Sequence, residues 1–266
     1  MIPTTPPTSG FGFAVIGDFG SGDASERAVS DAVRAWSSNH RLDAIVTTGD
    51  NVYESGAPEE LDGAWIQPYG WVAGEHVPVL AALGNHDVVT DAGDPELRLF
   101  DLPGRWYART IGPVRFIVLD ANDPTDPQQL AFLHAQLARR DVAPWTVAVF
   151  HQPAFSCSFH GSTPEVDEAW VPLFARGGVD LVLNGHDHAY ERFAPIDGVT
   201  YVVDGSGGAD LYPASTVLCP KGTPDYVVAN ARDHGFVALT ATANHLVGQA
   251  ITAGGRVIDT FELPER

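Results

Sequence analysis

Short apolar runs alternate with polar turns along most of the chain. Runs rich in Val, Ile and Leu that end in Gly, Asp or Asn turns predict buried strands, because they are short and bounded by turn residues. The 3.6-residue spacing of apolar positions predicts helices between them. Strands are expected within 11–20, 43–50, 77–87, 114–122, 146–153 and 180–188, and helices at 24–38, 127–140 and 166–178.

The last quarter of the chain has a different pattern. Short strands predominate after Gly198, within 198–208, 236–242, 245–251 and 256–263, and no helical pattern separates them. We find no internal repeat. The chain is therefore expected to form one α/β domain over 11–266, behind a flexible Pro/Thr-rich lead-in at 1–10.

The composition is strongly acidic. The 266 residues include 15 Lys plus Arg against 34 Asp plus Glu, which gives a net charge of −19. Such a surface argues against nucleic acid or an anionic membrane as a partner, and no apolar run is long enough for a membrane helix. A phosphate ester would be repelled by the protein as a whole. A site that binds one would need strong local positive charge, which metal ions supply without basic side chains.

The compartment is less clearly indicated. No secretion signal follows Met1, yet the opening sequence is typical of a mature N-terminus behind an added start. We expect a secreted or periplasmic protein, with a cytoplasmic one as the alternative. Cys157 and Cys219 could form one disulfide or remain two buried thiols.

Polar residues follow directly on the predicted strands. In α/β sheets, ligands bind beyond the carboxyl ends of strands, so residues at successive strand ends are expected to meet at one rim. Carboxylates, an amide and imidazoles at one rim are what a polynuclear metal site requires. The residues in question are Asp18, Asp50, Asn85, His86, His151, His186 and His188.

The ordered motifs resemble those of the calcineurin-like metallophosphatases, and more narrowly those of the purple acid phosphatases. The general family carries Asp-x-His in its first motif, whereas Gly20 stands here at the third position. Tyr53, three residues after Asp50, matches the ligand that replaces this imidazole in purple acid phosphatases. The motifs are GD (17–18), GDNVY (49–53), GNHD (84–87), FHQP (150–153), GHDH (185–188) and DGSGG (204–208).

This resemblance implies an αββα sandwich whose β-rich C-terminal segment completes the second sheet. It also implies two metal sites that share Asp50 as a bridge, one held by Asp18, Asp50, Tyr53 and His188, the other by Asp50, Asn85, His151 and His186. Two carboxylates and a phenolate suit a trivalent ion in the first site, and the phenolate requires a strong Lewis acid. The family implies iron(III) there, and iron(II), zinc or manganese in the second site.

The implied activity is that of an acid phosphatase, which releases inorganic phosphate from a small phosphomonoester by attack of a metal-bound hydroxide. By resemblance His86 and His160 face the substrate as proton donors, with Asp87 available to orient His86. Asn51 and Tyr190 are expected to support the ligands through hydrogen bonds. A phosphodiesterase on the same site is the nearest alternative, and a catalytically silent metal-binding protein is the other. Substrate choice is expected in rim loops at 57–74, 156–167 and 210–225.

Overall fold

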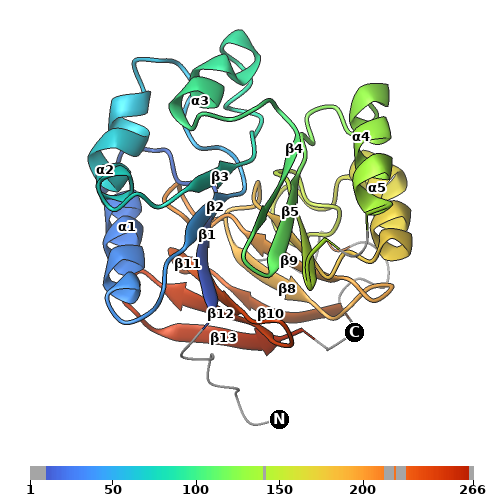
Figure 1. The fold of residues 1–266 in the computed structure, drawn as a ribbon. Helices are drawn as coiled ribbons and strands as arrows, with labels where there is room; N and C mark the ends of the chain where they lie inside the picture. The colour runs from blue at the N-terminus through green and yellow to red at the C-terminus, as the bar shows by residue number, and fades with distance from the viewer. Residues whose placement is uncertain (1–9, 140–141, 213–218, 220–225, 264–266) are drawn as a thin grey trace.

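The computed structural model describes residues 10–139, 142–212, 219 and 226–263. Its strands form two sheets that lie face to face (Figure 1). The six-stranded sheet has the order β13-β12-β11-β1-β2-β3, and the seven-stranded sheet has the order β10-β8-β9-β7-β6-β5-β4. The first consists of β1 (Phe11–Ile16), β2 (Ala44–Thr47), β3 (Val79–Ala81), β11 (Gly235–Ala241), β12 (Leu246–Thr252) and β13 (Val257–Glu262). The second consists of β4 (Tyr107–Ile111), β5 (Val114–Val118), β6 (Trp145–Val149), β7 (Leu181–Asn184), β8 (Tyr190–Phe193), β9 (Thr200–Asp204) and β10 (Val227–Ala231).

Helices cover the outer faces of both sheets. α1 (Ala24–Ser37) and α2 (Gln67–Gly74) lie outside the first sheet, and α4 (Pro127–Leu137) and α5 (Pro164–Gly177) outside the second (Figure 1). The short α3 (Asp94–Leu99) lies beyond the ends of the strands. The expected αββα sandwich is therefore confirmed. Among the described residues, no helix is both long and apolar enough to cross a bilayer.

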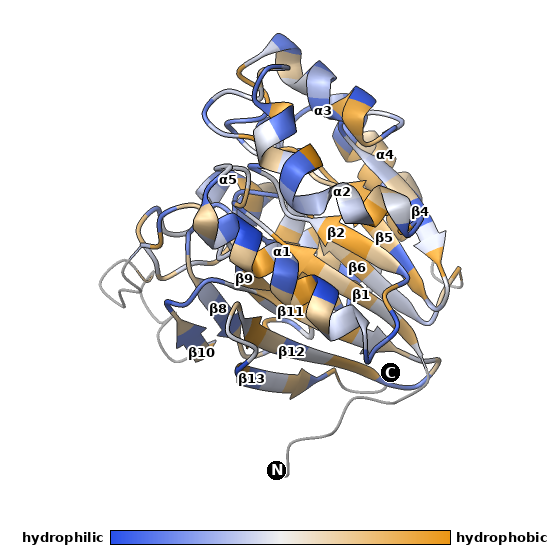
Figure 2. Ribbon diagram, turned by 90° about the vertical axis from the view of Figure 1, so that its left-hand side faces the viewer, coloured by the Kyte–Doolittle hydropathy of each residue, from blue (hydrophilic) through white to orange (hydrophobic). Residues whose placement is uncertain are grey.

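The central strands are apolar on both faces because one face packs against the other sheet and the opposite face packs against helices. Phe13 of β1 meets Phe116 of β5 edge to face, with ring centroids 5.2 Å apart. The opposite faces of these strands pack against the helices, so β1 and β5 are buried at every position. Figure 2 shows the same contrast, with hydrophobic colour along β1, β2 and β5 and hydrophilic residues on the outward side of α1.

The C-terminal strands differ from the expectation that they complete the second sheet. Of the strands after Gly198, β9 and β10 join that sheet, on either side of β8, whereas β11, β12 and β13 extend the first. β11 pairs antiparallel with β1, with Phe13 opposite Leu239. The physical reason is that β2 occupies only one edge of β1, and the other edge needs hydrogen-bonding partners for its buried backbone.

The segment 57–74 was expected to be a rim loop and is instead largely helical. A π-helical turn, Asp62–Ile66, runs directly into α2. Trp65 and Tyr69 are buried there, and their rings lie 5.8 and 5.4 Å from that of Phe19. Most of the expected 210–225 loop and nearly all of the 1–10 lead-in lie outside the described residues.

Candidate metal centre

Loops after four parallel strands of the two sheets converge on one point. Asp18 follows β1, Asp50 follows β2, His151 follows β6, and His186 and His188 follow β7. Asp18, Asp50 and His186 have positive φ angles of 54°, 49° and 71°, in the left-handed region that side chains other than glycine rarely adopt. Strained backbone of this kind is concentrated at functional sites, because the surrounding fold must hold it in place.

The possible metal-ligand atoms of these side chains lie close to one another. Nε2 of His151 is 3.2 Å from Oδ2 of Asp50, and Nε2 of His188 is 3.4 Å from Oδ1 of Asp18. The Tyr53 hydroxyl lies 3.1 Å from both Asp50 Oδ2 and His188 Nε2. One ligand atom each from Asp50, His151 and His186 fall within 4.8 Å of one another, a spacing that could hold a metal ion.

Backbone carbonyls fix the direction of two imidazole rings. Nδ1 of His151 hydrogen bonds to the carbonyl of Thr48 at 3.0 Å, and Nδ1 of His188 to the carbonyl of Asp210 at 2.7 Å. Each ring therefore carries a proton on Nδ1 and directs Nε2 toward the carboxylates. This is how proteins usually orient histidine ligands of metals.

The turn that carries Asn85 lies against Asp50. The backbone N–H of His86 donates to Asp50 Oδ1 at 3.0 Å, and a Cβ on Gly84 would collide with that same oxygen. The side-chain oxygen of Asn85 is buried and has no hydrogen-bond partner among the described residues. A buried amide oxygen without a partner is costly, and a metal ion beside it would remove that cost.

The electrostatics also suit a cation at this position. Burial alone would lower the pKa of His151, but the Asp50 and Asp18 carboxylates outweigh it and raise the pKa to about 10. Burial, with Asp18 and Asp50 adding to it, raises the pKa of the Tyr53 phenol far above its usual value. The carboxylates thus favour positive charge here, and a phenolate at Tyr53 requires a multivalent cation. The donor set therefore fits metal ions.

Asp87 connects the loops of the centre through hydrogen bonds. Its buried carboxylate accepts hydrogen bonds from the backbone N–H groups of Asn51 at 2.8 Å and Gly84 at 2.7 Å, and from the Asn51 side chain at 2.8 Å. The ring of His86 is held elsewhere, by a 2.7 Å hydrogen bond from Nδ1 to the carbonyl of Glu54. Asp87 therefore supports the backbone around Asp50, and it does not orient the His86 ring as the motif suggested.

His160 lies on the other side of the centre. Its ring stacks on that of His186, with centroids 4.3 Å apart, and its backbone N–H donates to Asp187 Oδ1 at 2.7 Å. The structure thus places His160 against the ligand group, and His86 against the ring of Tyr53 at 4.6 Å.

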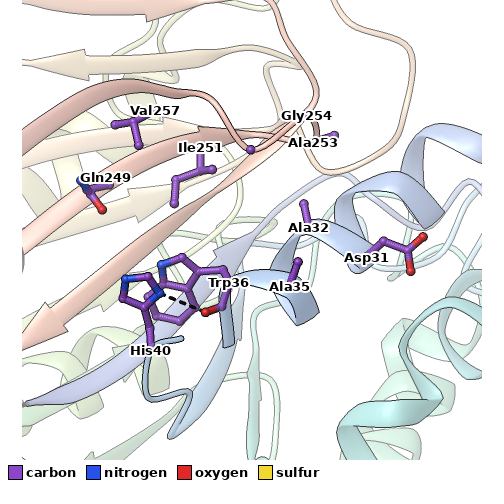
Figure 3. A pocket seen from close by; sticks show the side chains of 11 residues that line it. Asp31, Ala32, Ala35, Trp36, His40, Gln249, Ile251, Ala253, Gly254 and Val257 are labelled. Atoms are coloured by element: carbon purple, nitrogen blue, oxygen red, sulfur yellow. Dashed lines mark hydrogen bonds between the residues drawn. The ribbon is translucent and has the colours of Figure 1, made fainter. Parts of the chain in front are cut away.

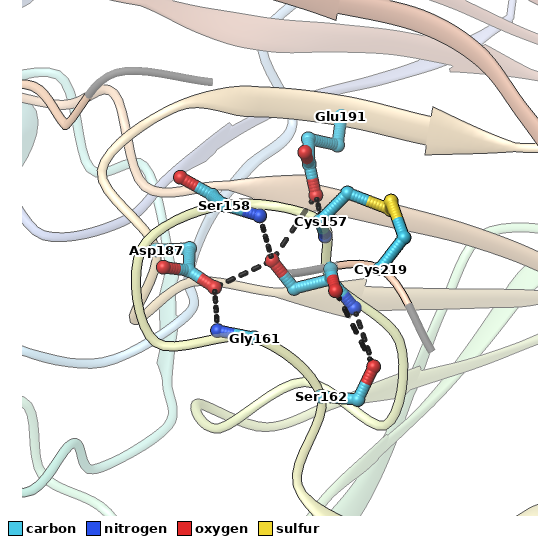
Figure 4. Close-up of a disulfide and its surroundings, with 8 residues drawn as sticks. Cys157, Ser158, Gly161, Ser162, Asp187, Glu191 and Cys219 are labelled. Atoms are coloured by element: carbon cyan, nitrogen blue, oxygen red, sulfur yellow. Dashed lines mark hydrogen bonds between the residues drawn. A yellow bond between two sulfur atoms is a disulfide. The ribbon is translucent and has the colours of Figure 1, made fainter. Parts of the chain in front are cut away.

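A disulfide and a buried polar network hold the loop that carries His160. Cys157 is bonded to Cys219, which settles the alternative left open by the sequence (Figure 4). The hydroxyl of Ser156 lies between Asp187 Oδ2 at 2.5 Å and Glu191 Oε2 at 3.1 Å. Glu191, labelled in Figure 4, also accepts from the backbone N–H of Cys157. Burial raises the pKa of Glu191 to about 7. The network fixes the loop backbone just before His160.

Two tyrosines have contacts that the sequence did not predict. Tyr212 was not singled out, yet its ring stacks on His188 with centroids 4.2 Å apart and planes 6° apart. It stands in an irregular segment with no motif, so no pattern could have indicated it. Tyr190 was expected to support the ligands, but its hydroxyl donates to Asp259 of β13 at 2.7 Å, between the two sheets.

The structure contains a cleft beside the candidate metal centre and a second cavity beside α1. A cleft of about 440 Å³ opens directly onto Tyr53, His86 and His188. A second cavity, of about 500 Å³, lies between α1 and the strands β12 and β13, where Trp36 and Ile251 form much of its lining (Figure 3). The second cavity is mostly apolar, whereas the first is lined by Tyr53 and His188 of the ligand group, so the first cleft is the candidate functional site.

Comparison with known proteins agrees with this geometry. Residues 11–190 match the family described as calcineurin-like phosphoesterase, and residues 198–260 match the one described as iron/zinc purple acid phosphatase-like protein C. The chain therefore belongs to the calcineurin-like phosphoesterase family, with a C-terminal part of the purple acid phosphatase kind.

Several relatives and one similar solved structure are named purple acid phosphatases, and a further solved structure shares the fold. Purple acid phosphatase 17 of Arabidopsis thaliana is 28% identical over 73% of this chain and 68% of its own length. Probable inactive purple acid phosphatase 1 of the same plant is 27% identical over 84% of this chain, which spans only 43% of that protein. The yellow lupin purple acid phosphatase PPD1 has a TM-score of 0.82 at 22% identity over 98% of this chain and 55% of its own. GAP50, described as the anchor in the inner membrane complex of Plasmodium, has a TM-score of 0.84 at 19% identity, covering 96% and 89%.

Proposed function

We propose that this protein is an acid phosphatase that hydrolyses phosphomonoesters at a binuclear metal centre. The observation that carries the proposal is the convergence of two carboxylates, a phenol and three imidazoles on one point beside the unpartnered amide oxygen of Asn85. Family membership supports the reaction class. The acidic composition supports metal ions as the source of positive charge, because basic side chains are scarce.

The two sets of metal ligands are those that the family resemblance implies, and the donor types support the choice of ions. Asp18, Asp50, Tyr53 and His188 would hold iron(III), and Asp50, Asn85, His151 and His186 would hold iron(II), zinc or manganese. When bound, the two ions would supply Lewis acidity, which neutralises charge on the phosphate and lowers the pKa of water. Asp50 suits the shared position because its Oδ2 lies 3.1 Å from the Tyr53 hydroxyl and 3.2 Å from Nε2 of His151, one ligand from each set.

The chain itself supplies two proton donors. Because Nδ1 of His86 is engaged by the Glu54 carbonyl, Nε2 is the atom that can pass a proton to the departing alkoxide. His160, stacked on His186, offers a second imidazole from the opposite side of the ligand group. Asp87 is assigned a positioning role, since its hydrogen bonds hold the backbone of Asn51, next to Asp50, and of Gly84, next to Asn85.

The setting we propose is secreted or periplasmic, with a small phosphoester as substrate, inorganic phosphate as product and no nucleic-acid or membrane partner. The Cys157–Cys219 disulfide supports an oxidising compartment. The net charge of −19 disfavours polyanionic partners.

The test is metal analysis with a visible absorption spectrum, together with rates on p-nitrophenyl phosphate and bis-p-nitrophenyl phosphate. We expect two metals per chain, a tyrosinate-to-iron charge-transfer band that Tyr53→Phe abolishes, and faster turnover of the monoester. Faster turnover of the diester would replace the proposal by a phosphodiesterase. Iron-free, colourless and fully active protein would refute the assignment of iron.

A catalytically silent protein is the second candidate, because several relatives are named probable inactive purple acid phosphatases. Here the candidate ligands, His86 and His160 are all present, which favours activity. A metal-loaded protein that hydrolyses neither ester would establish the silent alternative.

A further inference from the structure

The cleft beside the candidate centre is acidic. The described residues that line it include Asp23, Glu54, Glu60 and Asp210, together with the ring of Tyr212 and no lysine or arginine. In a phosphatase of this kind the phosphate contacts the metals, and the rest of the substrate occupies this space. The lining should therefore select the leaving group.

Two of the four carboxylates are already engaged. Asp23 is the N-cap of α1 and accepts from the backbone N–H groups of Ser25 and Glu26. Glu60 accepts from three backbone N–H groups of the turn at 54–57. These two side chains hold local structure and are less available to a ligand.

Glu54 and Asp210 are different. Both are exposed, and neither carboxylate has a hydrogen-bond or ion-pair partner among the described residues. Their backbones, however, are fixed, because the Glu54 carbonyl holds His86 and the Asp210 carbonyl holds His188, each at 2.7 Å. The hydrogen bonds that orient two imidazoles of the centre thus also place two free carboxylates at the cleft.

Within the described part of the chain, no arginine pairs with Glu54 or Asp210. The guanidinium of Arg27 donates to the carbonyl of Gly22 at 2.8 Å, and that of Arg232 to the carbonyl of Leu211 at 3.0 Å. Neither arginine is among the described residues lining the cleft. Lys221, the single lysine of the chain, falls outside the described residues.

From these contacts we propose that the cleft selects phosphomonoesters whose alcohol carries a positive charge, namely phosphates of amino or quaternary-ammonium alcohols. The proposal rests on the phosphatase function proposed above. Glu54 and Asp210 attract the cationic group and repel leaving groups with a second phosphate or a carboxylate. Tyr212 offers its ring to an ammonium group, as aromatic residues do in choline-binding sites.

The experiment uses three two-carbon phosphates of similar size but different charge on the metal-loaded protein. These are O-phosphoethanolamine, 2-hydroxyethyl phosphate and phosphoglycolate, with cationic, neutral and anionic leaving groups, and p-nitrophenyl phosphate reports general phosphatase activity. We expect kcat/KM to fall in that order, with the cationic substrate about tenfold above the neutral one, since exposed charge pairs have modest effects.

A charge-matched pair of variants assigns the effect. Glu54→Gln with Asp210→Asn should reduce the cationic-to-neutral ratio of kcat/KM about fivefold to tenfold. Glu59→Gln with Asp31→Asn removes the same charge from exposed residues that do not line the cleft, and should leave the ratio unchanged.

A wild-type ratio at or below one overturns the proposal, as does a ratio that both double variants change equally. If the metal-loaded protein hydrolyses none of the substrates, p-nitrophenyl phosphate included, the proposed function itself is refuted and the selectivity falls with it.

Discussion

Replacing Glu26 with glutamine should change how stability depends on pH. Glu26 lies in the first turn of α1 and is fully buried. Its Oε2 accepts a 2.6 Å hydrogen bond from the backbone N–H of Gly22, whereas its Oε1 has no partner among the described residues. Burial, with a smaller contribution from Asp23, raises the pKa of Glu26 from 4.5 to about 9. The folded protein therefore keeps this carboxyl protonated at neutral pH.

Proton linkage determines whether stability rises or falls with pH. Because the folded pKa lies above the unfolded one, this contribution to stability is fully present below pH 4.5 and is lost as the pH rises toward about 9. Within that window each pH unit costs about 1.4 kcal/mol, so from pH 5 to pH 8 the loss is about 4 kcal/mol. Glutamine keeps the shape and an acceptor oxygen but does not titrate.

Urea unfolding of both proteins at pH 5, 6.5 and 8, at equal metal loading, measures the effect. We expect Glu26→Gln to be close to wild type at pH 5 and about 4 kcal/mol more stable at pH 8. Glu59→Gln, which removes an exposed carboxylate, should follow the wild-type profile. A Glu26→Gln profile parallel to wild type from pH 5 to 8 would refute the reasoning, because it would mean that Glu26 titrates normally in the folded state.

Three further changes test the centre and the core. Asp50→Ala should empty both metal positions, and full metal stoichiometry by elemental analysis would contradict the bridging role. Cys157→Ser should lower the free energy of unfolding by about 4 kcal/mol, since the disulfide closes a loop of 62 residues, and adding reductant to wild type should reproduce the loss. Trp170→Ala removes a fully buried ring that packs edge to face on Phe150, so urea unfolding should show a loss of about 3–5 kcal/mol, and a loss below 1 kcal/mol would contradict that packing role.

The sequence was most informative where one strand end carries one polar residue. Asp18, Asp50 and His151 each follow a continuous apolar run, and strand direction alone brings such positions to one rim. This local pattern predicted an α/β domain with these residues at one rim, and the family resemblance added the two-sheet architecture. It could not predict which sheet the C-terminal strands join, because β11 contains no signal for its partner and pairs with β1 across more than 200 residues of chain.

The helical segment after Asp62 was missed because its local signals oppose a helix. Gly63, Pro68 and Gly70 are turn-forming or helix-breaking residues, and the segment contains no clear helical pattern. Packing of Trp65 and Tyr69 around Phe19 overrides these weak preferences. Supporting contacts such as the stacking of Tyr212 on His188 depend on tertiary structure in the same way, and a one-dimensional pattern does not contain them.

Gly20 and Tyr53 show what the structure adds to a motif. The sequence displays them as two separate departures from the general family pattern, a missing histidine and an added tyrosine. In the fold they are coupled. The chain at 51–52 crosses directly over Gly20, so that any Cβ there would collide with the carbonyl of Asn51, and the backbone N–H of Tyr53 donates to the carbonyl of Gly20 at 2.9 Å. The close approach that excludes an imidazole at position 20 is thus the same contact that brings the Tyr53 hydroxyl to Asp50. Gly20→His alone would displace Tyr53 rather than provide a further metal ligand beside it.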